Sequence, residues 1–305
     1  MGRRLLLALL SASLLLALGV VVELPVGSTD AAVAKKRAKK SRATPSLVSD
    51  TASAVDPLGF WGEIDCVDER RHQLISTGGD QHPTITGEDQ GNDSFRRLTV
   101  MDGDENWGER CELGDNDHQT GRTAVYREGS RWVTQLSVRL PTDFPLDDDT
   151  WQVIMQMKQT GPSANSGGTP VLELDAYDGE YRLRQSLSTR DAGDSRELWS
   201  APVTTGRWTR FSFDVRYSRN PARGSIAVSV DLNGDGDFLD AGEQSGTMRT
   251  YTLKVETPGG ERDGIKPGKS IPSHLRAGVY HDEEYSCPSG CYVDLDNVQM
   301  MRAGW

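Results

Sequence analysis

The sequence lacks three features, and each absence narrows the class of protein. No helical periodicity persists beyond a turn or two, so the pattern does not favour a helical fold. After the first apolar run there is no second one long enough to span a membrane. Positive charge is scarce, because 34 Lys and Arg stand against 45 Asp and Glu, with a formal net charge of −11 at pH 7. So acidic a chain argues against nucleic acid as a partner.

The first residues have the pattern of an export signal. Two arginines precede a long apolar run, and Ala32-Val33-Ala34 fits the small-x-small cleavage pattern. We therefore predict a signal peptide over residues 1–34 and a secreted, extracellular protein. The length of the apolar run leaves an uncleaved membrane anchor as the alternative.

Residues 35–55 are basic and then rich in Ser, Thr and Ala, without apolar periodicity. This composition predicts a disordered linker. We expect its cations to be solvated, with contact to an acidic cell wall or membrane surface as the alternative.

The pattern from residue 56 to residue 305 predicts one all-β domain. Short alternating runs recur between clusters of Gly, Asp, Asn and Pro, and hairpin turns are indicated at 127–131 and 177–181. Runs at this spacing are typical of a concanavalin-like β-jelly roll, in which two antiparallel sheets pack face to face. We expect a monomer. The expected strands cover residues 122–128, 131–140, 151–158, 170–177, 180–187, 207–217, 225–232, 248–256, 274–281 and 291–300.

Four cysteines in an exported chain suggest two disulfides. Three pairings are formally possible. Cys287 and Cys291 flank a tight turn and are expected to pair, which leaves Cys66 with Cys111. A zinc site is the alternative, but no histidines stand at ligand spacing from these cysteines.

Three segments, 107–114, 151–158 and 274–281, are expected to carry polar side chains on the face that points away from the core. Successive strand residues point to opposite faces, so Gln152, Ile154, Gln156 and Lys158 should lie opposite Trp151, Val153, Met155 and Met157. If the three strands are neighbours, they form a basic patch with a phenol on an otherwise acidic protein. The expected members of this face are Arg110, Glu112, Gln156, Lys158, His274, Arg276 and Tyr280.

Five short motifs resemble one family. They are "ERCEL" (109–113), "QMK" (156–158), "RWTRFSFDVRYS" (207–218), "LRAGVY" (275–280) and "YVDLDNVQ" (292–299). Together they are similar, in the right order over roughly residues 95–302, to heparin-lyase-I-like and alginate-lyase-like polysaccharide lyases with a jelly-roll fold. The resemblance implies an acidic polysaccharide as substrate and cleavage by β-elimination.

The resemblance also implies roles for individual residues. Arg110 and Gln156 match the positions that bind the uronate carboxylate and stabilise the dianion that develops. Tyr280 matches the acid that protonates the leaving oxygen. Lys158 stands where the family has a histidine, so it is expected to be the base, or to stay charged while Tyr280 serves as both base and acid. The expected substrate contacts are Arg276, Glu112 and His274.

The segment 231–243, "DLNGDGDFLDAGE", resembles the oxygen-rich first half of an EF-hand loop. Position twelve is Gly242 instead of Glu, and the flanks read as strands. We predict a structural Ca²⁺ loop, with an acidic solvated turn as the alternative, and no organic cofactor. The expected ligands are Asp231, Asn233, Asp235, Asp237 and Glu243.

Two other functions compete with a lyase. The segments 62–69 and 172–180 are similar to the carboxylate strand of family-sixteen glycoside hydrolases, but parity places Glu173 and Asp178 on opposite faces, where they cannot act as a pair. A non-catalytic carbohydrate-binding or cell-wall-associated module is favoured by the missing histidine, the acidic domain and the basic tether.

Overall fold

The computed structural model describes residues 47–50, 61–76, 94–105, 108–114, 126–146, 151–159, 169–187, 194–256, 267–281, 285–287 and 290–304, all within the compact unit Arg42–Trp305. The predicted signal peptide and most of the predicted linker lie outside these residues. In the part of the chain described, no helix is long and apolar enough to cross a membrane.

The described elements are fifteen strands and one 3₁₀ turn, η1 (Glu69–Arg71). The strands are β1 (Leu47–Asp50), β2 (Glu63–Cys66), β3 (His72–Ser76), β4 (Ser94–Val100), β5 (Arg110–Gly114), β6 (Arg131–Arg139), β7 (Gln152–Gln159), β8 (Leu172–Tyr177), β9 (Glu180–Ser186), β10 (Ser195–Pro202), β11 (Trp208–Arg216), β12 (Ser225–Asp231), β13 (Met248–Arg249), β14 (Ser273–His281) and β15 (Cys291–Arg302).

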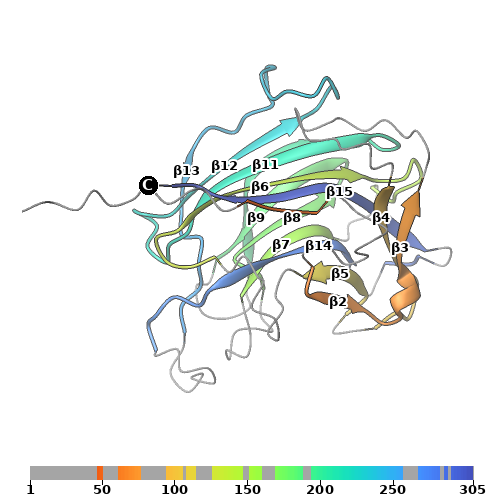
Figure 1. Ribbon diagram of the computed structural model, residues 1–305, viewed down its shortest axis with the longest axis horizontal. Helices are drawn as coiled ribbons and strands as arrows, with labels where there is room; N and C mark the ends of the chain where they lie inside the picture. Colours follow the sequence, from red (N-terminus) through yellow and green to blue (C-terminus); the bar gives the residue numbers. More distant parts are fainter. Residues whose placement is uncertain are drawn as a thin grey trace, which may run out of the picture. The chain divides into compact units, whose positions relative to one another are not determined.

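The strands form two antiparallel sheets (Figure 1). Sheet A has the order β13-β12-β11-β6-β15-β4-β3, and β1 pairs with β15. Sheet B has the order β10-β9-β8-β7-β14-β5-β2. Both sheets combine hairpin neighbours, such as β8 and β9, with neighbours far apart in the sequence, such as β7 and β14, as in a Greek-key jelly roll. The predicted fold class, an all-β sandwich of two antiparallel sheets, is confirmed.

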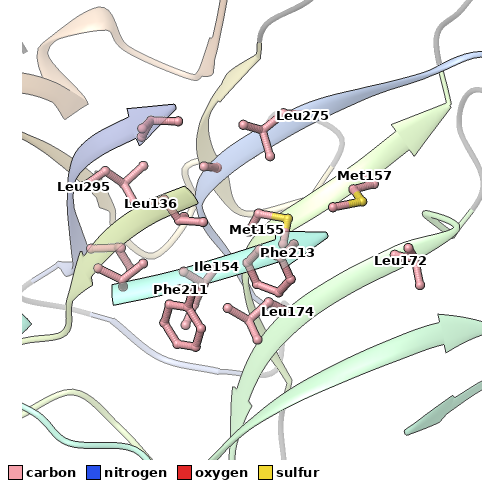
Figure 2. Packing of buried hydrophobic residues seen from close by; sticks show 14 of the residues in the cluster. Leu136, Ile154, Met155, Met157, Leu172, Leu174, Phe211, Phe213, Leu275 and Leu295 are labelled. Atoms are coloured by element: carbon pink, nitrogen blue, oxygen red, sulfur yellow. The ribbon is translucent and has the colours of Figure 1, made fainter. Parts of the chain in front are cut away.

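The core lies between the inner faces of the two sheets (Figure 2). Phe211 and Phe213 of β11 are fully buried there, as the alternation of the sequence predicts. They meet inward residues of sheet B such as Met155 and Leu174. Each large apolar side chain buried in this way stabilises the fold by about 1.5–3 kcal/mol, so the sandwich holds the outer face of sheet B in a fixed shape.

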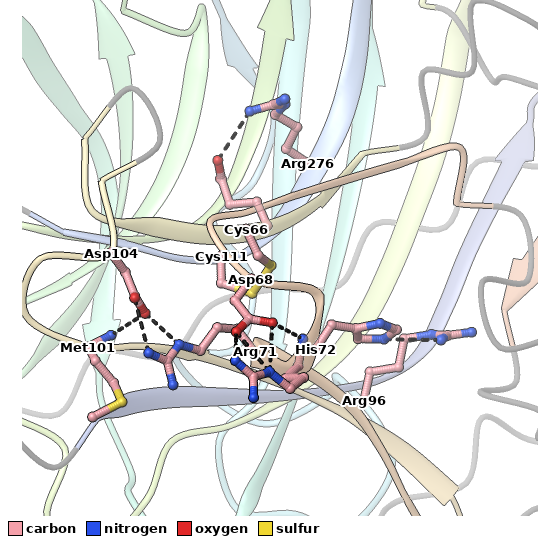
Figure 3. The surroundings of a disulfide bond; sticks show 11 residues. Cys66, Asp68, Arg71, His72, Arg96, Met101, Asp104, Cys111 and Arg276 are labelled. Atoms are coloured by element: carbon pink, nitrogen blue, oxygen red, sulfur yellow. Dashed lines mark hydrogen bonds and ion pairs between the residues drawn. A yellow bond between two sulfur atoms is a disulfide. The ribbon is translucent and has the colours of Figure 1, made fainter.

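Both predicted disulfides are present. Cys66 of β2 is bonded to Cys111 of β5 at the edge of sheet B (Figure 3). Cys287 is bonded to Cys291 at the start of β15. The first bond joins residues 45 positions apart, so it ties the β2 edge to the strand that carries Arg110.

Some boundaries differ from the sequence-based expectation. Residues 47–50, which lie in the predicted linker, form β1 beside β15. The expected strand 248–256 is only two residues long as β13, because the chain then leaves the sheet edge. Its next groups bond elsewhere: the N–H of Thr250 donates to Gly224 O, and that of Thr252 to Ser218 O.

Candidate active site

Sheet B brings the predicted site strands together, because β14 lies between β5 and β7 (Figure 1). Tyr280 stands opposite Arg110 of β5, and Arg276 stands opposite Gln156 of β7. The three strands that carry the predicted site residues are therefore neighbours in the sheet, which the sequence alone does not establish. Side chains of directly opposed residues lie within contact distance of one another.

A bulge in β7 changes which of its side chains reach this face. The pairing with β8 shifts register between Val153 and Met155. Ile154, Met155 and Met157 all belong to the core, so the expectation that Ile154 points away from it is wrong. Trp151, expected in the core, instead packs edge-on against Tyr280 at a centroid distance of 4.8 Å. The extra residue of a bulge reverses the alternation on its N-terminal side.

The ring of Tyr280 is held on several sides. The Arg110 guanidinium carbon lies 3.8 Å from the ring centroid, a cation–π contact, and Trp151 meets the ring at 74°. Gly108 lies so close that an added Cβ would stand 2.8 Å from Cε2 of Tyr280. These contacts fix the direction of the phenol while its side chain remains partly exposed.

Glu112 organises the cations and the amide around it. It is fully buried, and it accepts a hydrogen bond from Gln156 Nε2 at 2.5 Å. Arg110 and Arg276 each place an Nη1 atom 3.4 Å from its Oε2. These are the contacts of a positioning group, because Glu112 is covered by the side chains that it orients.

Arg276 is surrounded by carboxylates. Besides Glu112, it bonds Asp65 at 2.5 Å and Glu63 at 2.9 Å. Burial lowers its pKa, but the charges of Glu112, Asp65 and Glu63 outweigh burial and raise the pKa of Arg276 above its ordinary value. Arg276 therefore stays charged, and most of its donors face protein carboxylates.

Lys158 is the titratable amine of the site. Burial, followed by the positive charge of Arg110, lowers the pKa of Lys158 from 10.5 to about 8. The side chain keeps some contact with solvent. A substantial fraction of Lys158 is therefore neutral near pH 8, so its nitrogen can accept a proton. His274 stands opposite Lys158 and is 4 % exposed, so it is covered in this structure.

The same face continues over two strands that sequence reasoning left out of the site. Glu173 and Asp175 of β8 and Arg182 and Arg184 of β9 lie on it, because Leu172, Leu174 and Ala176 point into the core. The alternation of "LELDAY" is the signal that places Glu173 and Asp175 on this outer face. Asp178 lies in the β8–β9 turn and Glu173 lies within β8, so the structure gives no support to a hydrolase pair of Glu173 and Asp178.

Gly278 sets how closely β5 and β14 approach. A Cβ at this position would lie 2.8 Å from the Cα of Glu112, and the φ of Gly278 is +153°. We expect Gly278→Ala to destabilise the fold by about 1–3 kcal/mol. The added methyl group would clash with the backbone of β5, which is packed in the sheet and cannot move aside.

Thermal unfolding followed by circular dichroism measures this loss, at roughly 2–4 °C per kcal/mol for a domain of this size. Gly103→Ala is the control, since Gly103 also has positive φ (+81°) but has nothing within 4 Å of an added Cβ. Equal melting temperatures for the two variants would contradict the close approach.

The loop 231–243 is held by carboxylates that accept backbone N–H bonds. Asp231 accepts from Gly234 at 2.6 Å and Gly236 at 2.9 Å, and Glu243 accepts from Leu232 at 2.8 Å and Asp240 at 3.1 Å. Asn233, Asp235 and Asp237 hydrogen-bond within the loop. Among the described residues, no group of three or more His, Cys, Asp or Glu is placed to hold a metal ion. Calcium binding at this loop stays a prediction.

A chelator tests that prediction. If Ca²⁺ binds the loop, removing it with EDTA lowers the melting temperature by about 5–10 °C, and added Ca²⁺ restores it. Asp235→Asn should abolish the response, whereas Asp143→Asn, outside the loop, should retain it. A melting temperature unaffected by chelation would contradict Ca²⁺ binding and favour the alternative, an acidic solvated turn.

Comparison with known proteins identifies the class. A family model described as polysaccharide lyase matches residues 77–294. Since this match spans more than half of the chain, the protein belongs to that family and is a polysaccharide lyase. The family resemblance found in the motifs is confirmed. No curated protein matched the sequence.

Two solved structures share the fold. The chain is similar to an endo-β-1,4-glucuronan lyase from the fungus Trichoderma reesei, with a TM-score of 0.53 and 14 % identity over 83 % of this chain and 93 % of that one. It is also similar to the marine PL-14 alginate lyase from Aplysia kurodai, with a TM-score of 0.55 and 10 % identity over 86 % and 100 %. At such identities the likeness shows the jelly-roll fold alone.

Proposed function

We propose that this polysaccharide lyase cleaves a uronate-containing polysaccharide by β-elimination on the outer face of sheet B. One observation carries the proposal: three strands that are distant in sequence place donors, an amine with a lowered pKa and an oriented phenol on one face, where Arg110 contacts the Tyr280 ring and its charge lowers the pKa of Lys158. The residues are Arg110, Gln156, Lys158 and Tyr280.

The first task of the site is to hold the uronate carboxylate. The proton beside a carboxylate is weakly acidic while that carboxylate keeps its full charge. Arg110 and the amide of Gln156 are held on this face by hydrogen bonds that each donates to Glu112. They bind the substrate carboxylate and stabilise the second negative charge as it develops.

The second task is proton transfer. Neutral Lys158 takes the C5 proton, and the electron pair of the C5–H bond forms the C4=C5 double bond. The C4–O bond breaks, and Tyr280 gives its proton to the leaving glycosidic oxygen. Solvent then returns the proton from Lys158 to Tyr280, so no co-reactant is consumed.

The test is ultraviolet absorbance over time, with the purified domain and a panel of glucuronan, alginate and glycosaminoglycans. Elimination creates a conjugated unsaturated uronate, which hydrolysis and binding do not produce. A rising signal on a polyuronate supports the proposal. A flat signal together with measurable binding indicates the carbohydrate-binding alternative, and new reducing ends without absorbance indicate hydrolysis.

We also propose that the protein is secreted and acts as a monomer, with the basic segment after the signal available to contact an acidic cell wall. The support is the sequence pattern of residues 1–55. The intact mass of the exported protein tests the cleavage site, and its mass in solution tests the monomer.

A further inference from the structure

Glu173 extends the row of site residues by one strand. On sheet B, Arg276 stands opposite Gln156, Gln156 opposite Glu173, and Glu173 opposite Arg184. Opposed residues on one face have Cβ atoms about 4.5–5.5 Å apart. A sugar chain that crosses the strands along this row passes from Gln156 directly onto Glu173.

The Glu173 carboxyl is buried, and its ion pair with a cation is longer than those of its neighbour Asp175. Glu173 is 7 % exposed, and Arg184 Nη1 lies 3.9 Å from its Oε1. That guanidinium lies closer to Asp175, at 3.2 Å, and Arg182 bonds Asp175 at 2.9 Å. Asp175, not Glu173, is therefore the main acceptor of the two arginines.

Every packed element contributes charge around this carboxyl. Arg184 faces it from β9, Asp175 from its own strand, Lys158 from β7, and Lys254 from the segment after β13. Burial is the strongest influence and raises the pKa of Glu173 from 4.5 to about 7; Asp175 adds to the rise, and the cations oppose it. At mildly acidic pH the group is therefore a neutral hydrogen-bond donor.

We propose that Glu173 is a substrate-binding residue that, when neutral, donates a hydrogen bond to the sugar unit next to the one held by Gln156, and, when ionised, repels the polyuronate. The inference rests on the proposed β-elimination site and adds a pH-dependent subsite to it. Ionisation of Glu173 adds one negative charge beside an anionic polymer, which weakens binding.

The experiment compares KM and kcat of the wild type and Glu173→Gln from pH 6 to pH 8.5 on the polyuronate that gives turnover. Because only the neutral fraction binds well, KM of the wild type should rise about tenfold between pH 6 and pH 8. Gln keeps a donor and cannot ionise, so KM of the variant should rise much less than that of the wild type, by the part that loss of the Lys158 charge causes. Glu180→Gln, exposed at the start of β9, is the control and should follow the wild type.

A structural role for Glu173 predicts a different result, namely a changed melting temperature with the KM profile of the wild type retained. Parallel KM profiles for the wild type and Glu173→Gln overturn the proposal.

Calorimetric titration of glucuronan and alginate at pH 6 and pH 8 separates this inference from the proposed function. Binding that weakens with pH clearly more in the wild type than in Glu173→Gln supports the subsite even if no elimination is seen. Absence of binding of both polymers at both pH values overturns the subsite, whereas the proposed function fails only if no polymer of the panel gives the ultraviolet signal.

Discussion

Tyr280→Phe is expected to lower kcat by about 10²- to 10⁴-fold, because the leaving oxygen loses its proton donor. KM should remain nearly unchanged. The ring keeps its contacts with Arg110 and Trp151, and neither contact uses the hydroxyl. The rate of absorbance increase on a polyuronate measures the effect.

The matched control is Tyr292→Phe. Tyr292 lies on β15 of sheet A and also has an arginine, Arg97, 3.8 Å from its ring centroid. The two substitutions remove the same atom from the same kind of stacked pair, but only one lies at the proposed site. If both variants turn over substrate like the wild type, Tyr280 is not the acid.

Lys158→Arg is expected to lower kcat by about 10²- to 10⁴-fold, although it conserves the positive charge. An arginine side chain stays protonated throughout the pH range of an assay, so it cannot accept the C5 proton. The neutral amine is the active form in the wild type. The kcat of the wild-type enzyme should therefore rise with pH through about 8 and level off above that pH.

The same variant separates the two roles open to Lys158. If Lys158 only supplies charge while Tyr280 is both base and acid, Lys158→Arg retains most of the activity and Lys158→Ala loses it. Lys269→Arg, on the exposed surface, is the control for the substitution itself. Retained activity in Lys158→Arg would rule out Lys158 as the base.

The sequence alone predicted most strands of the sandwich, because alternation is a local property. The pairs Phe211–Phe213 and Met155–Met157 point inward as their period of two requires. The same period placed Arg110 and Glu112, Gln156 and Lys158, and Arg276 and Tyr280 on outward faces. Motif order added the family, and the match to residues 77–294 confirms it.

Alternation fails where the backbone departs from regular pairing. Because of the bulge before Met155, Trp151 contacts the ring of Tyr280 instead of the expected core. Nothing in the local sequence pattern indicates this bulge. The expected strand 248–256 alternates well but ends after Arg249, since its hydrogen-bond partners lie outside the sheet edge.

What the sequence determined is therefore the set of outward side chains on each strand, the two disulfides and the class of fold. Only the tertiary structure decided which strands are neighbours, and so that Gln156 lies between Arg276 and Glu173. It also decided the chemistry of Lys158 and Glu173. Their pKa values move because of burial and of charges from other strands, and both are set by partners distant in the chain.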